Sequence, residues 1–425
     1  MPAMPNQLAY LTADLPGIGG VIKQRHEDFI VTELPLYEPC GEGEHLYLFV
    51  QKTNLTTKHV ASQIARVLNV SPRAINFAGM KDKHAITRQM FSLHLPGTAS
   101  QDTQRVALLE GEPFTVLWAD RHHNKLRRGH LLGNRFDLRI RNVEPTAVIR
   151  AKKILDRLVA QGVPNYFGPQ RFGSLANNHL VGRALIKDDD QEVLDQLLGL
   201  ADQYDHEPTY QARQAYDAGD YERALTCWPR ALRYEYQVLA ALTKGQSIGK
   251  ALRCIDKQQR QFFASATQSY LFNQVLNQRV MDKNFSELLP GDLAIKHENH
   301  SVFAVDEDQA AAENAADGRI TLGEISPSGP MWGSDLLLPK GELEKLECSA
   351  LESFEIPRQT IQASPLTQGS RRPLRVMIQN PDISGGVDEH GSYVHVQFEL
   401  GKGSFATVVL SELMKNQVDC DLGEA

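Results

Sequence analysis

Residues 79–88 read GMKDKHAITR and form a polar segment between two predicted strands. The strand before the segment covers residues 75–78, whose sequence INFA is mainly apolar. After the segment, three apolar residues alternate with polar ones, which is the pattern of a half-buried strand: Phe91, Leu93 and Leu95. We therefore expect the charged residues of this segment in a loop that joins two strands.

Asp82 is the residue of this loop that suggests chemistry. It lies between Lys81 and Lys83 and close to His84, and opposite charge favours the ionised form of a carboxyl group. An ionised aspartate can act as a nucleophile, a base or a metal ligand, but the neighbouring cations supply no further ligands for a metal. From the local sequence alone, an ion pair with a structural role explains Asp82 at least as well.

A second motif, residues 163–173 (VPNYFGPQRFG), places three aromatic residues among glycines, an amide and an arginine. Glycine allows close approach of the backbone, and aromatic rings and arginine can stack on nucleobases. The alternative interpretation is a turn between two elements with its rings in the hydrophobic core. The motif alone does not decide between the two.

The remaining apolar patterns predict mixed secondary structure. A helix begins near Thr57, which can cap it, and from about Ala151 to Val280 the pattern is mainly helical. Residues 360–373 (TIQASPLTQGSRRP) have the polar, proline-containing composition of a linker. The chain is therefore expected to have a β-rich first part, a large middle insert and a closing strand–turn–helix. Further predicted strands cover residues 29–33, 45–50 and 393–400.

Length and composition narrow the class of protein. The 425 residues predict two or three domains, and 42% hydrophobic with 23% charged residues is ordinary for a folded protein. No apolar run reaches the ~18 residues of a membrane span, and no secretory signal is recognisable. The five cysteines form no CxxC pair or zinc-ligand cluster. We therefore expect a cytoplasmic protein with reduced cysteines, no metal and no membrane contact.

One segment reverses the overall charge of the chain, which is −7. Residues 121–141 (RHHNKLRRGHLLGNRFDLRIR) contain seven Lys or Arg residues, and Asp137 is the one acid among them. The second half of the segment alternates and is predicted as a strand with arginines on one face. A solvated strand face is the alternative, but the concentration of charge favours an RNA-facing surface. Lys125, Arg127 and Arg128, just before the strand, are the predicted phosphate contacts.

The loop around Asp82 and the motif around Phe167 together resemble the tRNA pseudouridine(13) synthase family, TruD. The similarity runs from about residue 17 to 414 and is sparse over residues 181–255 and 281–390. The acidic segment Asp188–Asp220 and the alanine-rich residues 309–316 match no motif of the family. Further matching blocks follow in family order: Lys23 before HEDFIVTE, then GEGEHLYLFVQKTNLTT, LRRGHLLGNRFDLRIRNV, SYLFNQVLNQR and GSFATVVLSELM.

This resemblance implies an α+β fold: a pseudouridine synthase core with a bent, mainly antiparallel sheet, and an inserted TruD-specific α/β domain. The implied catalytic core covers residues 1–175 and 373–425, and the implied insert covers residues 176–372. The split β-rich organisation expected from the apolar patterns agrees with this division.

The resemblance also implies a tRNA pseudouridine synthase that isomerises uridine at position 13, in the D arm of tRNA, after the base has flipped out of its stack. The reaction breaks the N1–C1′ bond and joins C5 to C1′, so it requires no cofactor. Asp82 would be the catalytic carboxylate, as nucleophile or base, and Lys23 its basic partner. Phe167 would stack on the target base.

The other candidate residues are expected to contact the substrate. Asn165 is predicted to hydrogen-bond near the catalytic loop or the base, Arg171 to bind a phosphate or a carboxylate, and Lys81 and His84 to face the RNA. A non-catalytic RNA-binding protein or RNA chaperone on the same fold is the main alternative, although a pure binder has no use for a carboxylate among phosphate contacts. A nucleoside hydrolase would require a second carboxylate, which neither motif supplies.

Overall fold

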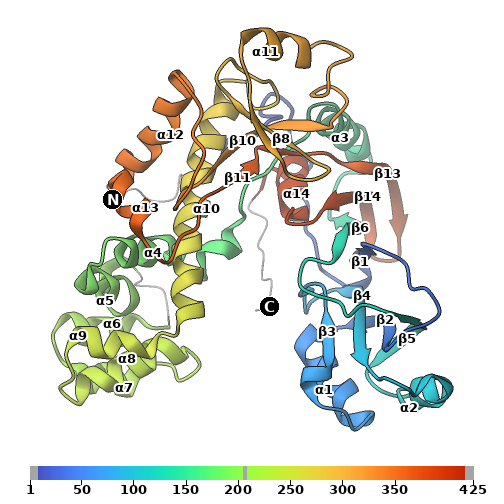
Figure 1. Ribbon diagram of the computed structural model, residues 1–425, viewed down its shortest axis with the longest axis horizontal. Helices are drawn as coiled ribbons and strands as arrows, with labels where there is room; N and C mark the ends of the chain where they lie inside the picture. Colours follow the sequence, from blue (N-terminus) through green and yellow to red (C-terminus); the bar gives the residue numbers. More distant parts are fainter. Residues whose placement is uncertain (1–7, 204–207, 417–425) are drawn as a thin grey trace. The chain divides into compact units, whose positions relative to one another are not determined.

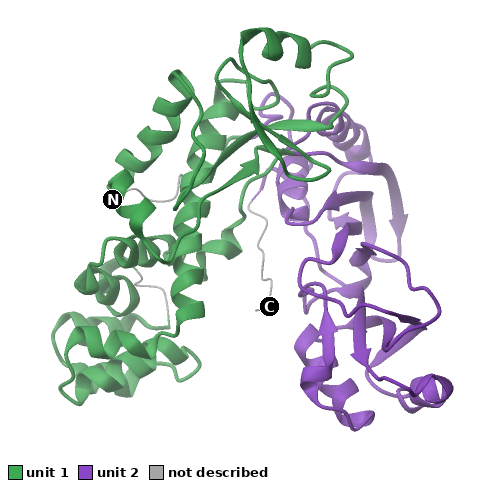
Figure 2. Ribbon diagram, viewed as in Figure 1, with its two compact units in different colours: residues 1–9, 164–375 green, residues 10–163, 376–425 purple. Residues whose placement is uncertain are grey.

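The computed structural model describes residues 8–203 and 208–416, which form two compact units (Figure 2). Among the described residues, unit 2 contains residues 10–163 and 376–416, and unit 1 contains residues 8–9 and 164–375. The chain passes between units after residues 163 and 375, whereas the predicted domains divide after residues 175 and 372. The motif around Phe167 therefore belongs to unit 1. No helix within the described ranges is long and apolar enough to cross a membrane.

Unit 2 is built on a mainly antiparallel sheet, as predicted. Its described strands follow the order β13-β14-β6-β1-β4-β2-β5, with β3 paired to β4 beside this path (Figure 1). β1 runs parallel to β4, and the other pairs of this sheet are antiparallel. The strands are β1 (Phe29–Pro35), β2 (His45–Thr53), β3 (Ile75–Phe77), β4 (Ile86–His94), β5 (Phe114–His122), β6 (Leu131–Arg141), β13 (Gln379–Asp388) and β14 (Gly391–Gly401).

Helices bury the apolar face of this sheet in two cores. Val60 and Ile64 of α1 pack against the apolar residues of β2 and β4, while α3 and α14 pack against β1, β6 and β14. The cap of α1 is Thr56, which accepts a hydrogen bond from the backbone N–H of His59. The prediction of Thr57 as the cap was therefore wrong by one residue. The helices are α1 (Thr57–Val67), α2 (Asp102–Leu108), α3 (Ala147–Gln161) and α14 (Ala406–Met414).

Unit 1 is organised around the long helix α10 (Lys257–Met281), which ends the stretch that was predicted to be mainly helical, from about Ala151 to Val280. The side chain of Asp256 caps α10 by accepting from the backbone N–H of Gln259, and α4 and β10 pack along it. The other helices of unit 1 are α4 (Asn178–Ile186), α5 (Asp190–Leu198), α6 (Tyr210–Asp217), α7 (Tyr221–Cys227), α8 (Arg233–Thr243), α9 (Ile248–Ala251), α11 (Glu307–Glu313), α12 (Glu342–Ser353) and α13 (Arg358–Ala363).

The small antiparallel sheet of unit 1 overturns the predicted linker at residues 360–373. The described strands follow the order β11-β10-β8-β9, and β11 (Ser370–Pro373) occupies the end of the supposed linker. Arg371 is buried there in an ion pair with Glu347 at 2.7 Å, so the basic pair is part of the packed structure. The other strands of this sheet are β8 (Leu293–Lys296), β9 (Val302–Ala304) and β10 (Ile325–Met331). Two short strands lie where the chain passes from one unit to the other: β7 (Val163–Pro164) and β12 (Arg375–Val376).

Candidate active site

Asp82 lies in the loop between β3 and β4, as predicted, and Lys23 donates a hydrogen bond to it. The Lys23 Nζ is 3.2 Å from Asp82 Oδ2. The Lys23 side chain is 12% exposed and the Asp82 side chain 33%, so the carboxylate remains accessible to a ligand. The Lys23 ammonium also lies 4.3 Å from the centroid of the Phe29 ring. The structure thus brings together the predicted pair, whose catalytic roles stay a prediction.

Lys81, the residue before Asp82, forms a second ion pair, which is buried. The Lys81 Nζ lies 2.7 Å from Glu33 Oε2, and both side chains are almost fully enclosed. The other oxygen of Glu33 accepts from the backbone N–H of Met90 on β4. Lys81 therefore anchors the loop to β1 and β4, and the prediction that it faces RNA was wrong because its charge is already compensated inside the unit.

Neutral polar side chains complete the attachment of the loop. The backbone N–H of Lys81 donates to the Thr57 hydroxyl at 3.0 Å, and that hydroxyl donates to Gln89 Oε1 at 2.8 Å. The Gln89 amide in turn donates to the backbone carbonyl of Gly79 at 3.1 Å. These bonds tie both ends of the Gly79–Lys81 segment to α1 and β4, so the position of Asp82 is set by the scaffold around it.

A pattern in the strands could have revealed this scaffold from the sequence. Leu46, Leu48 and Val50 point inward on β2, and Lys52 has the same parity and is buried. Glu33 likewise continues the inward face of β1 after Phe29 and Val31. Charged residues at inward positions are costly unless they find partners. Charged residues at such positions, at the ends of two strands near the loop, are a sequence signal of a buried polar site that the two motifs alone do not reveal.

The basic loop, defined here as residues 123–130, lies beside the loop of Asp82. The backbone N–H of Gly129 donates to the carbonyl of Ala78 at 2.9 Å, and the N–H of Leu126 donates to the Ser92 hydroxyl on β4. The predicted contacts Lys125, Arg127 and Arg128 are all exposed on it, and His84 is exposed in the neighbouring loop. A cationic surface therefore adjoins Asp82 within unit 2.

Three of the four other arginines of residues 121–141 form ion pairs inside unit 2, which corrects the expectation of one continuous RNA-facing strand. Each of these three has an acidic partner, which compensates the charge that would otherwise attract phosphates. The basic loop keeps the cationic surface that was predicted, whereas Arg139 of the strand lies 5.2 Å from the centroid of the Tyr393 ring. The pairs are Arg121 with Asp102, Arg135 with Glu399, and Arg141 with both Asp28 and Asp388.

Asn165 is fully engaged within unit 1. Its backbone N–H donates to the carbonyl of Leu374 and its side-chain amide donates to the carbonyl of Pro373, both at 2.9 Å. Its side-chain oxygen accepts from the Arg372 guanidinium at 2.5 Å. These contacts fix the motif to β11 and the residues after it.

Phe167 is buried, at 8% exposure, and its surroundings are cationic. The Arg372 guanidinium lies 4.2 Å from the centroid of the ring and that of Arg171 5.6 Å away. Arg171 donates to the hydroxyls of Ser269 and Ser265 on α10. Burial lowers the pKa of both arginines, that of Arg372 to about 10. The rings of the motif thus lie in a core, as the alternative interpretation expected, but next to charges that suit an anionic ligand.

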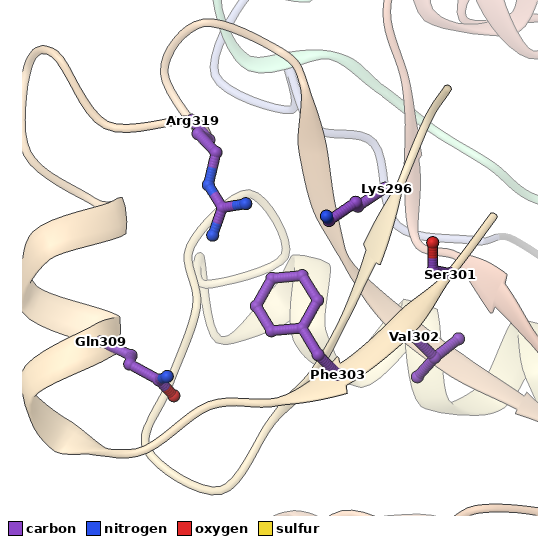
Figure 3. A pocket seen from close by; sticks show the side chains of 6 residues that line it. All are labelled: Lys296, Ser301, Val302, Phe303, Gln309 and Arg319. Carbon is purple, nitrogen blue, oxygen red and sulfur yellow. The ribbon is translucent and has the colours of Figure 1, made fainter. Parts of the chain in front are cut away.

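A pocket of about 290 Å³ also occurs in unit 1, away from the predicted site residues. Lys296, Phe303 and Arg319 are among its lining residues (Figure 3). Arg319 already binds Glu313 through its Nε at 2.9 Å, so its charge is largely compensated. Within residues 8–203 and 208–416, no group of three or more His, Cys, Asp or Glu side chains is arranged to hold a metal ion.

Comparison with known proteins defines the class to which this arrangement belongs. The family profile described as tRNA pseudouridine synthase D (TruD) matches residues 6–413. The tRNA pseudouridine synthase D of Geotalea daltonii is 40% identical, with 96% of this chain and 99% of the relative covered. That of Thermus thermophilus is 34% identical, with coverage of 97% and 93%.

A solved structure shows the same fold. The crystal structure from Methanosarcina mazei that is assigned as tRNA pseudouridine synthase D has a TM-score of 0.81 at 27% identity, and 96% of each chain is covered. Taken with the sequence matches, this defines the chain as a pseudouridine synthase by family and fold. More narrowly, it belongs to the tRNA pseudouridine synthase D family, and its α+β fold is the one predicted.

Proposed function

We propose that this protein isomerises uridine to pseudouridine in tRNA, at position 13 of the D arm, with Asp82 as the catalytic carboxylate. The observation that carries the proposal is the accessible Lys23–Asp82 ion pair, mounted on a buried polar scaffold beside the basic loop. Family membership supplies the reaction and the substrate class. The substrate in turn favours a cytoplasmic location.

The chemistry requires an ionised carboxylate at neutral pH. A lysine ammonium at hydrogen-bonding distance favours that form, so Lys23 fits the role of basic partner. Asp82 either adds to the base or ribose or removes the C2′ proton to give a glycal; in both routes the N1–C1′ bond breaks and C5 joins C1′. The proton leaves C5 and N1 gains one, so the overall reaction is an isomerisation that needs no cofactor.

The basic loop is proposed to hold backbone phosphates while the target base is flipped out. Changing Lys125, Arg127 and Arg128 together to alanine should flatten the slope of log affinity against log salt by about two to three units, at about 0.7–0.9 per lost contact. The rate for bound tRNA should hardly change, because phosphate contacts position the RNA. Binding titrations between low and moderate salt measure the slope. An unchanged slope would show that the RNA binds elsewhere.

Phe167 is proposed to stack on the target base. Asn165 is proposed to hold the motif in place, and Arg171 to bind an anionic group such as a phosphate. Because the ring is buried, the informative change is Phe167→Leu, which keeps most of the apolar volume but removes the aromatic face. Base–aromatic stacking is worth about 1–3 kcal/mol, so the single-turnover rate should fall roughly 5- to 150-fold while the tRNA dissociation constant stays within about threefold. Equal losses in rate and affinity would assign Phe167 to the core alone.

The proposed activity can be tested in cells. Chemical mapping of pseudouridine in tRNA from cells with the protein and from a matched strain without it should show one position, 13 of the D arm, that depends on the protein. A strain complemented with the Asp82→Asn variant separates modification from RNA binding. If the maps of all three strains are identical, the proposal is wrong and the non-catalytic RNA-binding alternative takes its place.

A further inference from the structure

Lys52 is a buried cation that the proposed chemistry does not use. Lys52 is 1% exposed, and its Nζ donates two hydrogen bonds, both to backbone carbonyls. One goes to Leu55, just before α1, at 2.6 Å, and the other goes to Asp82 itself at 2.8 Å. The same ammonium thus contacts the main chain of the proposed catalytic residue and the segment that leads into α1.

This buried position is energetically unfavourable for a lysine unless the ammonium stabilises the structure around it. Burying a charge costs free energy that carbonyl oxygens offset only in part, and a methionine would fill a similar volume without that cost. The contribution of Lys52 therefore lies in what its three N–H donors and its charge hold in place. The two groups they hold are the start of α1 and the backbone of the loop that carries Asp82.

The electrostatic surroundings of Lys52 come mainly from that loop. The pKa of Lys52 is lowered to about 8: burial is the main cause, the Asp82 carboxylate opposes it by raising the pKa, and the Lys81 ammonium adds to the lowering. The cross-strand neighbours of Lys52 are Thr87 on β4 and Phe114 on β5, which carry no charge. The charges one contact further away are Glu33, bound to Lys81, and Lys23, bound to Asp82.

We propose that Lys52 is a positioning residue for Asp82: it fixes the loop backbone at Asp82 against β2 and α1, so that the carboxylate is presented to Lys23 and to the substrate. This inference rests on the proposed catalytic role of Asp82. Lys52 itself contacts no reacting atom, and it acts through the backbone carbonyl and through the field of its charge.

The direction of the pH effect follows from the lowered pKa. Below about pH 8 the amine is charged and binds both carbonyls as an ammonium. As the pH rises through that value, the amine loses its charge and the attraction to Asp82 weakens. The advantage that Lys52 gives to the rate should therefore be complete near neutral pH and decline in alkaline solution.

The test compares Lys52→Met with the wild-type chain, and uses Lys58→Met, an exposed lysine of α1, as the matched control. Single-turnover rates at saturating protein and tRNA dissociation constants are measured from pH 6.5 to 9.5. A catalytic group displaced by about 1 Å can cost roughly 10²-fold in rate. We expect Lys52→Met to lose about 10- to 100-fold in rate at pH 7 with affinity within threefold. The ratio of the wild-type rate to the variant rate should shrink toward pH 9.5, while Lys58→Met behaves as wild type.

Ionisation of the substrate cancels in this ratio because both proteins act on the same tRNA. A Lys52→Met variant that is folded by circular dichroism and retains the wild-type rate, or whose ratio to wild type is constant with pH, would overturn the proposal. If that variant does not fold, Lys52→Arg replaces it, because arginine keeps the charge and does not titrate in this range. The decline in rate at alkaline pH that Lys52 causes in the wild type should then disappear. An unchanged decline would contradict the proposal. Asp82→Asn in the same assay separates the two levels, because an active Asp82→Asn variant would refute the proposed function itself.

Discussion

Asp82→Asn is expected to abolish pseudouridine formation and to leave tRNA binding intact. The amide is isosteric with the carboxylate but is neither a nucleophile nor a base, so the single-turnover rate should fall by at least about 10³-fold, as when a group that acts in the chemical step is removed. Removal of a negative charge cannot weaken binding to phosphates. Release of tritium from C5-labelled uridine in tRNA measures the rate, and a titration on the same preparation measures affinity.

Glu38→Gln is a suitable control for this variant, since Glu38 is an exposed carboxylate of the same unit and its change to an amide should be silent. Folding of Asp82→Asn should be preserved because the Lys23–Asp82 pair is partly exposed and such pairs contribute little to stability. Because an amide is neither a nucleophile nor a base, a rate of even one-tenth of wild type in the purified Asn variant would mean that another group performs the reaction.

The second large effect is on stability. Glu33→Ala leaves the Lys81 ammonium buried without its carboxylate partner, and breaking a buried ion pair in this way costs about 3–5 kcal/mol. The backbone N–H of Met90 loses its acceptor as well. We expect a markedly lower midpoint of urea unfolding, followed by circular dichroism, and loss of activity as the Asp82 loop comes free.

The double variant Glu33→Leu with Lys81→Met is the matched comparison. Replacing both members of a buried ion pair with apolar residues of similar volume is often close to neutral, so the unfolding midpoint should return most of the way to the wild-type value. An unchanged midpoint in Glu33→Ala alone would instead indicate that Lys81 faces solvent, where it could contact RNA as its sequence context suggested.

The sequence predicted well those elements whose signal is local. The helix that was predicted to begin near Thr57 is α1, alternation identified β4 and β14, and α10 lies in the stretch predicted to be mainly helical. The loop of Asp82 followed because it is polar and lies between two such elements. Family resemblance then paired Lys23 with Asp82, a contact across 59 positions that no periodicity would reveal.

What could not be predicted are the distant partners of charged residues. Periodicity shows which face a side chain occupies, but not which residue meets it there. Lys81 was predicted to face RNA, and nothing in its local sequence indicates its partner Glu33, which is 48 positions away. Residues 360–373 were predicted as a linker from their composition, which does not show that Arg371 binds an acid on α12. For the same reason, the pairing of Arg141 with Asp28 and Asp388 could not be predicted from the sequence.

The most direct test of the central claim uses purified protein and a single unmodified tRNA transcript with uridine at position 13. After incubation, pseudouridine is mapped along the whole transcript by chemical derivatisation and sequencing. The wild-type chain should convert uridine 13 completely, and the Asp82→Asn variant should bind the same transcript without converting it. Tight binding by the wild-type chain with no pseudouridine at any position would contradict the account and identify the protein as a non-catalytic RNA binder.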